Sequence, residues 1–117
     1  MKRFKYPFSG FLRLVTKDSH YVLHLVSAVC VIIVSYFLSI NMTEWLFILS
    51  AIFLVLLTEA LNTAIEEVVD LVTSDFEQHA KYAKDIASFA VLLSSIYAAL
   101  IGVIILLPRL LKLIGVL

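Results

Sequence analysis

The chain has 117 residues, enough for one domain, and its composition excludes several classes of protein. Apolar side chains make up 62% of it, whereas a soluble domain usually holds about 45–50%. Nine basic and nine acidic residues give a formal net charge of zero, which argues against a nucleic-acid binder because such proteins carry a basic excess. The single cysteine excludes an intramolecular disulfide and a cysteine-based zinc site. With only 3 Gly and 2 Pro, the sequence favours long membrane helices over a β-barrel.

Residues 4–19 are expected to form an amphipathic helix at the membrane surface. Apolar residues recur at helical spacing on one side of the helix: Phe4, Phe8, Phe11, Leu12 and Val15. Basic residues recur on another side: Lys5, Arg13 and Lys17. Aromatic side chains on one face and basic side chains on another suit a helix in the headgroup region. The alternative is a basic arm that is merely solvated. Pro7 is expected to begin the regular part of the helix, because proline is tolerated in a first turn.

Three later segments are apolar enough to cross a membrane. The first predicted span covers residues 22–40 and the third covers residues 86–107, which Pro108 is expected to end. Each is close to the ~20 residues that cross the hydrocarbon core. The second helix is predicted over residues 44–72, where an apolar half precedes a half with acidic side chains. The predicted fold class is an all-α integral membrane protein, in which residues 1–117 form one domain with a surface helix and three transmembrane helices.

The placement of Lys and Arg predicts the orientation in the membrane. Most of these residues fall on one side of the predicted spans: Lys2, Arg3, Lys5, Arg13, Lys17, Lys81 and Lys84. Only Arg109 and Lys112 fall on the other side. Because cytoplasmic loops carry an excess of Lys and Arg, we expect the N-terminus and the polar loop 73–85 to face the cytoplasm.

Four polar residues share one face of the second helix at its expected cytoplasmic end: Glu59, Asn62, Glu66 and Asp70. The three acids fall within about 40° of one another around the helix axis. A carboxylate in or near the bilayer is costly and rarely lacks a role. Their mutual repulsion calls for a cation or protons, and carboxylates suit Mg²⁺, which usually takes one or two of them together with substrate phosphates. The alternative is a polar stripe that lines a contact between helices.

Three more charged residues are expected near the same depth. Lys84 and Asp85 come at the start of the third span, where Lys84 would neutralise nucleotide phosphates or else serve only as a cytoplasmic anchor. Asp18 follows the surface helix and would supply a second metal ligand, or else only mark a helix boundary. The sequence contains no phosphate-binding glycine loop and no motif of the soluble kinases.

A specific pattern runs along the second helix and into the third: Glu59-Ala60-Leu61-Asn62-Thr63-Ala64-Ile65-Glu66, then Val68-Val69-Asp70, then Lys84-Asp85. In this pattern the chain resembles the prokaryotic diacylglycerol kinase family, which includes the undecaprenol kinases. The resemblance covers essentially the whole chain. It implies a homotrimer in the bacterial inner membrane that phosphorylates a lipid alcohol with ATP and Mg²⁺. It also implies active sites at the cytoplasmic interface, between subunits.

The resemblance also implies a role for individual residues. Glu59 matches the catalytic base, and Asn62 matches a polar residue beside the reacting groups. Glu66 matches a metal ligand, and Asp18 stands where the family usually has a metal-binding glutamate. The implied cofactor and nucleotide contacts are Asp18, Glu66, Asp75, Glu77, Lys84 and Asp85.

Several positions depart from the family pattern. Asp18 is one methylene shorter than the usual glutamate, so it reaches less far towards a metal ion. Val22 replaces a common arginine, Glu77 stands where histidine is frequent, and Lys81 stands where glycine is frequent. The choice between diacylglycerol and undecaprenol therefore stays open at this point.

Two other functions are compatible with the residues. An oligomeric subunit that conducts ions or protons would use Glu59 as its intramembrane acid, but it needs one isolated acid rather than a series that continues into the cytoplasm. A non-catalytic membrane scaffold would tolerate Glu59→Gln and Glu66→Gln. Lipid phosphorylation is the favoured hypothesis.

Overall fold

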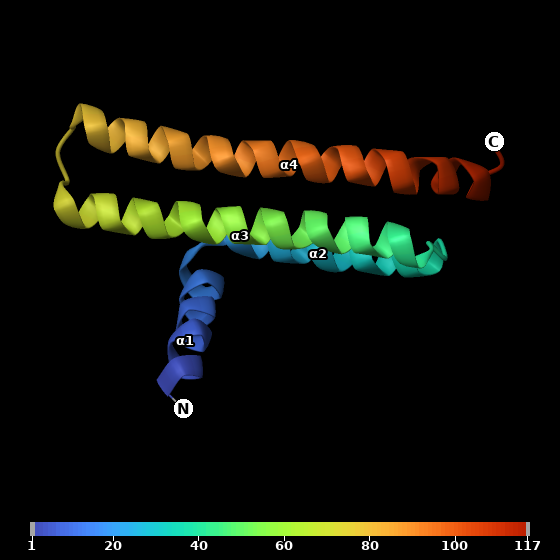
Figure 1. The fold of residues 1–117 in the computed structure, drawn as a ribbon, viewed down its shortest axis with the longest axis horizontal. Helices are drawn as coiled ribbons and strands as arrows, with labels where there is room; N and C mark the ends of the chain where they lie inside the picture. The colour runs from blue at the N-terminus through green and yellow to red at the C-terminus, as the bar shows by residue number, and fades with distance from the viewer. Residues whose placement is uncertain (1, 117) are drawn as a thin grey trace.

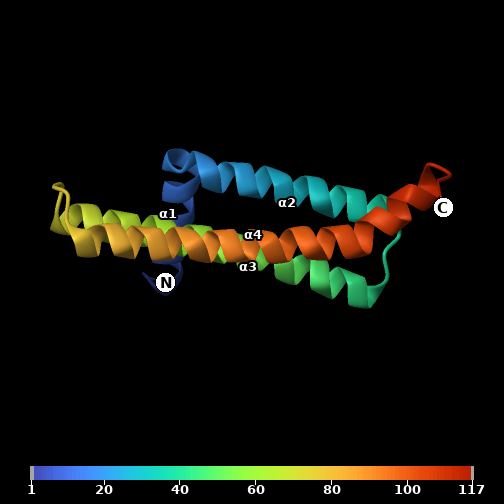
Figure 2. The same ribbon diagram turned by 90° about the horizontal axis from the view of Figure 1, so that it is seen from above.

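The computed structural model describes residues 2–116, which form four helices. They are α1 (Lys2–Lys17), α2 (Ser19–Phe37), α3 (Met42–Val72) and α4 (Gln78–Leu113). Helices α3 and α4 run antiparallel and side by side, α2 lies along α3, and α1 projects away from the bundle near the start of α2 (Figure 1, Figure 2). The prediction of an all-helical fold is confirmed.

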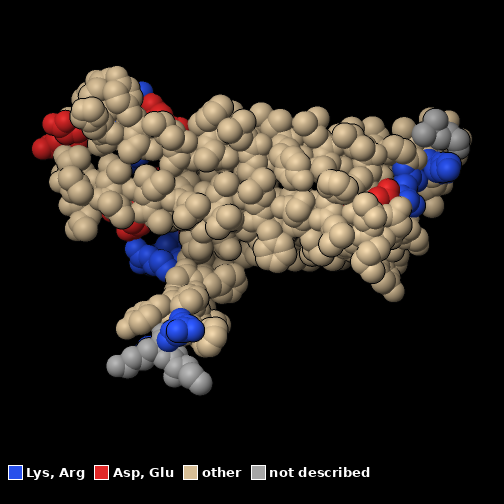
Figure 3. Space-filling view, in the orientation of Figure 1, with Lys and Arg blue, Asp and Glu red and all other residues tan. Residues whose placement is uncertain are grey.

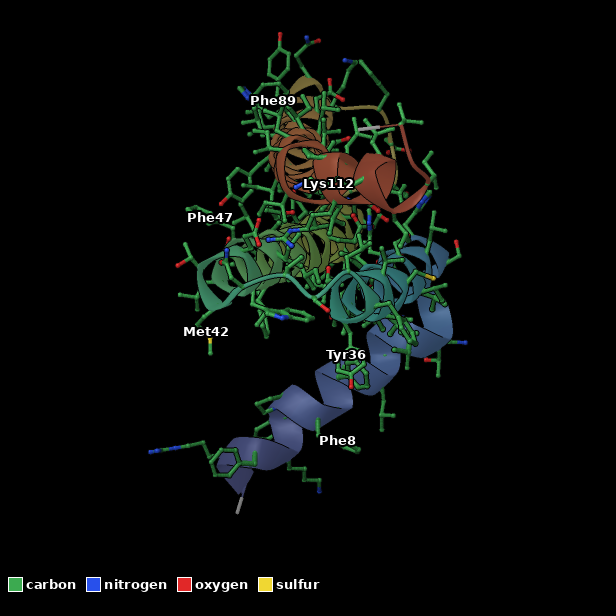
Figure 4. The ribbon with its side chains drawn as sticks, turned by 90° about the vertical axis from the view of Figure 1, so that its right-hand side faces the viewer. Phe8, Tyr36, Met42, Phe47, Phe89 and Lys112 are labelled. Carbon is green, nitrogen blue, oxygen red and sulfur yellow. The ribbon has the colours of Figure 1, made fainter. Side chains whose placement is uncertain are left out.

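Helices α2, α3 and α4 are long and apolar enough to cross a membrane, with 19, 31 and 36 residues. Large apolar side chains point outward from them, as Phe47 and Phe89 do in Figure 4, and these two are 48% and 55% exposed. On the face shown in Figure 3, Lys, Arg, Asp and Glu gather at the ends of the bundle and on α1, and the middle is uncharged. Because so large an apolar surface requires a lipid surround, we conclude that this is a multi-pass membrane protein.

Asp18 separates α1 from α2 and determines where α2 begins. Its carboxylate caps α2 by accepting hydrogen bonds from backbone N–H groups in the first turn, which have no partner within the helix. As a result α2 begins at Ser19, earlier than the predicted span 22–40, and α1 ends at Lys17 rather than at residue 19. Pro7 lies inside α1 and not at its start, because the helix already begins at Lys2. The location of α1 at a membrane surface stays a prediction.

The turn between α2 and α3 ends in a capping box. The Asn41 side chain accepts from the Glu44 backbone N–H at 2.9 Å, and the Glu44 carboxylate accepts from the Asn41 backbone N–H at 3.0 Å. This reciprocal pair satisfies two backbone donors at the helix start. Ser39, with a φ of 54°, takes the left-handed conformation that reverses the chain. The helix that corresponds to the first predicted span therefore ends at Phe37 and not at residue 40.

The prediction that Pro108 ends the third span is wrong, because α4 continues to Leu113. Proline lacks the N–H that would bond to a carbonyl one turn earlier, and α4 changes direction near its C-terminal end (Figure 2). The continuation is held by Arg109, whose guanidinium pairs with the Glu44 carboxylate at 2.5 Å. It also donates to the backbone carbonyl of Ser39 at 3.5 Å.

The start of α4 also differs from the prediction. The helix begins at Gln78, so the polar connection covers residues 73–77 and not 73–85. Lys84 and Asp85 therefore lie on a helix, where their side chains have fixed directions. This arrangement brings them beside the last turns of α3.

Isoleucine side chains and hydroxyl groups join α3 to its neighbours. The core cluster is formed by Ile40, Ile48 and Ile105, at the end of the bundle where the chain turns from α2 into α3. Between α3 and α4, the Thr58 and Ser94 hydroxyls lie 2.7 Å apart and the Ser50 and Tyr97 hydroxyls 3.1 Å apart. Hydroxyl bonds between helices stabilise packing in a membrane, where no water competes for them.

Candidate functional site

Three of the four polar residues predicted to share a face of α3 line one hollow at the corner of α1, α2 and α3. This hollow has a volume of about 200 Å³. We call it the carboxylate hollow, and its lining is Arg13, Leu14, Lys17, Asp18, His20, Glu59, Asn62, Thr63, Glu66 and Glu67. The structure therefore brings Glu59, Asn62 and Glu66 together with Asp18, which lies more than 40 residues earlier in the sequence.

Glu59 is the most deeply placed acid of the carboxylate hollow. It is only 5% exposed, and its titratable neighbours are Asp18, His20 and Glu66. Among the described residues it forms no ion pair. A carboxyl group this little exposed and without an ion pair is unfavourable for folding, which makes Glu59 a candidate for a chemical role in the hollow.

Asn62 links the acids of the hollow. Its side-chain N–H group donates to Glu66 Oε1 at 3.1 Å, which orients both side chains. Its Oδ1 atom is buried and has no hydrogen-bond partner among the described residues. Buried polar atoms are normally satisfied, so this oxygen is a candidate for contact with a ligand atom.

Asp18 has both carboxylate oxygens engaged. Oδ1 accepts from the backbone N–H groups of His20 and Tyr21 at 3.1 and 3.2 Å. Oδ2 accepts from the hydroxyl of Thr63 on α3 at 2.5 Å. Sequence reasoning missed Thr63, because its spacing marks it only as one more residue of α3 and nothing in the sequence pairs it with a residue so distant.

The remaining predicted site residues line a separate hollow of about 380 Å³ between the ends of α3 and α4. This loop hollow is lined by Val69, Asp70, Thr73, Ser74, Asp75, Phe76, Glu77, Ala80, Lys81, Lys84 and Asp85. Lys84 Nζ lies 2.7 Å from Asp70 Oδ1, and Lys81 Nζ lies 2.6 Å from Asp85 Oδ2. Within one chain the predicted nucleotide contacts Asp75, Glu77, Lys84 and Asp85 thus line one hollow, and Glu59 lines the other.

A second, apolar hollow lies beside the carboxylate hollow, where α1 meets α2 and α3. It has a volume of about 440 Å³ and is lined by Pro7, Gly10, Phe11, Arg13, Leu14, Tyr21, Ala60, Thr63, Ala64 and Glu67. Four of these residues, Arg13, Leu14, Thr63 and Glu67, also line the carboxylate hollow. The two hollows together suit an amphiphile, whose polar end would lie by the carboxylates and whose apolar part would lie against α1.

The donor set of the carboxylate hollow fits Mg²⁺ rather than a softer metal. Among residues 2–116 no three His, Cys, Asp or Glu side chains lie close enough to hold a metal ion unaided. Mg²⁺ does not need such a set, because it usually takes one or two carboxylates and completes its shell with water and substrate phosphates. Asp18 and Glu66 are the candidate carboxylate ligands, and the unpartnered Asn62 Oδ1 is a hard oxygen beside Glu66.

Comparison with known proteins places these features in a family. Residues 5–106 match the family described as prokaryotic diacylglycerol kinase. The chain is 33% identical to the undecaprenol kinase of Bacillus subtilis (strain 168), over 93% of this chain and 89% of that protein. It is 36% identical to a diacylglycerol kinase of Synechocystis, over 94% of this chain but only 63% of that protein. It is also 32% identical to the diacylglycerol kinase of Escherichia coli (strain K12), over 64% of this chain and 62% of that protein.

Proposed function

Because the chain belongs to the prokaryotic diacylglycerol kinase family and is therefore an ATP-dependent lipid kinase of a bacterial membrane, we propose that it phosphorylates the hydroxyl of undecaprenol beside Glu59. The observation that carries this proposal is the junction of the carboxylate hollow with the apolar hollow. Undecaprenol is proposed rather than diacylglycerol because Asn62-Thr63 and the start Phe4-Lys5-Tyr6 resemble the undecaprenol kinases, and a relative matched over 89% of its length carries that name.

Glu59 is proposed as the general base. It is the most buried acid described, at 5% exposure, and the next residue, Ala60, lines the apolar hollow. A lipid hydroxyl that enters from this side would lie against the Glu59 carboxylate, which would take its proton. As the lipid oxygen bonds to the γ-phosphorus of ATP, the bond from that phosphorus to the bridging oxygen would break and ADP would leave. Asn62, one turn further along α3, would accept a hydrogen bond at its free Oδ1 from the entering lipid hydroxyl.

Asp18 and Glu66 are proposed to hold Mg²⁺, which when bound would offset the negative charge on the ATP phosphates. Asn62 keeps Glu66 in place through the 3.1 Å hydrogen bond. Lys84, Asp85, Asp75 and Glu77 are proposed to contact the nucleotide from the loop hollow. Lys84 would lie against phosphate oxygens once it releases Asp70.

A homotrimer, the assembly that the family resemblance implies, is proposed because no residue of one chain lines both parts of the site. The carboxylate hollow and the loop hollow share no lining residue, so a loop hollow from a neighbouring subunit is a natural complement. Polar groups on a membrane helix also need protein or water beside them and not lipid. We further propose that the N-terminus and the connection 73–77 face the cytoplasm, where ATP is present, and that α1 lies on that surface.

Purified protein in detergent, incubated with labelled ATP and Mg²⁺, tests this function. We expect labelled undecaprenyl phosphate to form faster than labelled phosphatidic acid when the two lipids are supplied at equal mole fraction. Faster labelling of diacylglycerol would overturn the choice of lipid. No labelling of either lipid by well-folded protein would overturn the proposed site, and ion flux through liposomes without ATP would support a conducting subunit instead.

A further inference from the structure

Thr63 does not use its hydroxyl as four other hydroxyl residues of these helices do. Thr16, Ser50, Thr58 and Ser94 all donate to a carbonyl of their own helix, three or four residues earlier. Such a bond within the helix is the common choice for a helical threonine or serine. The Thr63 hydroxyl instead crosses from α3 to Asp18 Oδ2. This contact therefore joins α3 to the start of α2, two segments that are far apart in the sequence.

The contact fixes the one carboxylate oxygen that the helix cap leaves free. Oδ1 of Asp18 is already held by two backbone N–H groups at the start of α2. An aspartate suits this position because its short side chain reaches back to the backbone, whereas glutamate is not among the preferred N-cap residues. Without Thr63, the free oxygen of a capping aspartate would point in a direction set by α2 alone.

We propose, on the basis of the proposed function, that Thr63 is a positioning residue that aims the Asp18 carboxylate at the divalent cation of the carboxylate hollow. Thr63 lines both this hollow and the apolar hollow, so it stands where the lipid and the metal site meet. The short aspartate and the threonine act as one unit: the helix cap anchors one carboxylate oxygen, and the hydroxyl directs the other.

Binding of Mn²⁺, measured by electron paramagnetic resonance on the full chain with a non-hydrolysable ATP analogue and no lipid, tests the proposal. Thr63→Val keeps the shape of the side chain and removes the hydroxyl, and we expect roughly tenfold weaker Mn²⁺ binding, the size of one lost hydrogen bond to a charged group. Thr63→Ser keeps the hydroxyl and restores the affinity. Thr58→Val, a matched change on the same helix outside the site, leaves the affinity unchanged.

Asp18→Asn separates positioning from a merely structural role, because asparagine caps a helix as well as aspartate does. It should weaken Mn²⁺ binding by itself, and adding Thr63→Val should then cause no further loss. Wild-type Mn²⁺ affinity in Thr63→Val, or additive losses in the double variant, would overturn the inference. Since no lipid is present, this result is independent of which lipid, if any, is phosphorylated.

Discussion

Helix α3 carries two glutamates that are both withdrawn from solvent, and their surroundings are opposite. The Glu44 side chain is 22% exposed and is fully paired, since it accepts from the Asn41 backbone and from the Arg109 guanidinium. Glu59 is 5% exposed and has no ion pair among the described residues. A paired charge is what folding alone would select. An unpaired buried charge disfavours folding and indicates a different constraint.

The two ends of α3 therefore differ in what their side chains do. At the Glu44 end, the capping box and Arg109 close the bundle, and the Ile48 core lies beside them. At the Glu59 end, the side chains leave hollows and an unsatisfied amide oxygen. Stability is expected to depend on the first end and catalysis on the second.

The largest expected effect is on catalysis. Glu59→Gln should reduce lipid phosphorylation by about 10²–10⁴-fold, the usual contribution of a general base. The thermal midpoint in detergent should stay the same or rise, because the change removes an unpaired buried charge. Phosphorylation is measured with labelled ATP, and unfolding with intrinsic tryptophan fluorescence. Full activity of the Glu59→Gln enzyme would show that Glu59 is not the general base.

The next effect concerns the metal. Glu66→Gln should raise the Mg²⁺ concentration that gives half-maximal activity by at least about tenfold, since even groups that only support a metal ligand have effects of this size. A Mg²⁺ titration of the initial rate measures it. Glu67→Gln removes the same charge from the adjacent position, where the carboxylate only faces Arg13 at 3.9 Å, and it should give a smaller shift. Equal shifts for both variants would mean that net charge alone is being measured.

At the other end of α3 the expected effect is on stability. Glu44→Gln should lower the thermal midpoint by several degrees, because it breaks the pairing with Arg109. Arg109→Leu should do the same, and the double variant should lose less than the two single losses combined, as expected for residues in direct contact. Additive losses in this cycle would show that the ion pair is not what holds the end of α4.

The smallest expected effect is on the packing of α3 against α4. Thr58→Val removes the hydroxyl that lies 2.7 Å from the Ser94 hydroxyl and should lower the free energy of unfolding by about 0.6 kcal/mol, the average for such bonds between membrane helices. Reversible unfolding in mixed detergent micelles measures this change. A loss of several times that size would mean that the hydroxyl pair organises the whole helix contact.

The sequence was sufficient to predict the long helices and the acidic residues that share one side of α3. Hydropathy identifies long membrane helices because lipid demands them, and helical spacing places Glu59 and Glu66 on one face because the helix has a fixed period. Helix ends were less predictable. Pro108 fails to end α4, since the contacts of Arg109 with the α2–α3 turn hold the last turns in place.

The contacts between residues far apart in the chain could not be predicted from the sequence. Asp18 was expected near Glu66, but its pairing with Thr63 depends on how α1 and α2 meet α3, which no local pattern encodes. The loop hollow likewise depends on α4 beginning at Gln78, seven residues before Asp85. Local periodicity predicts which face a residue occupies, and only the tertiary packing decides what it faces.

The most direct test compares Glu59→Gln with Glu44→Gln in one experiment, measuring the rate of lipid phosphorylation and the thermal midpoint of each. We predict opposite results for the two variants. The Glu59 variant loses lipid phosphorylation and keeps its thermal midpoint. The Glu44 variant keeps its rate of phosphorylation per folded molecule, and its thermal midpoint falls. If both variants lost activity only in proportion to their stability, the buried acid at Glu59 would be structural, and the account given for it would be contradicted.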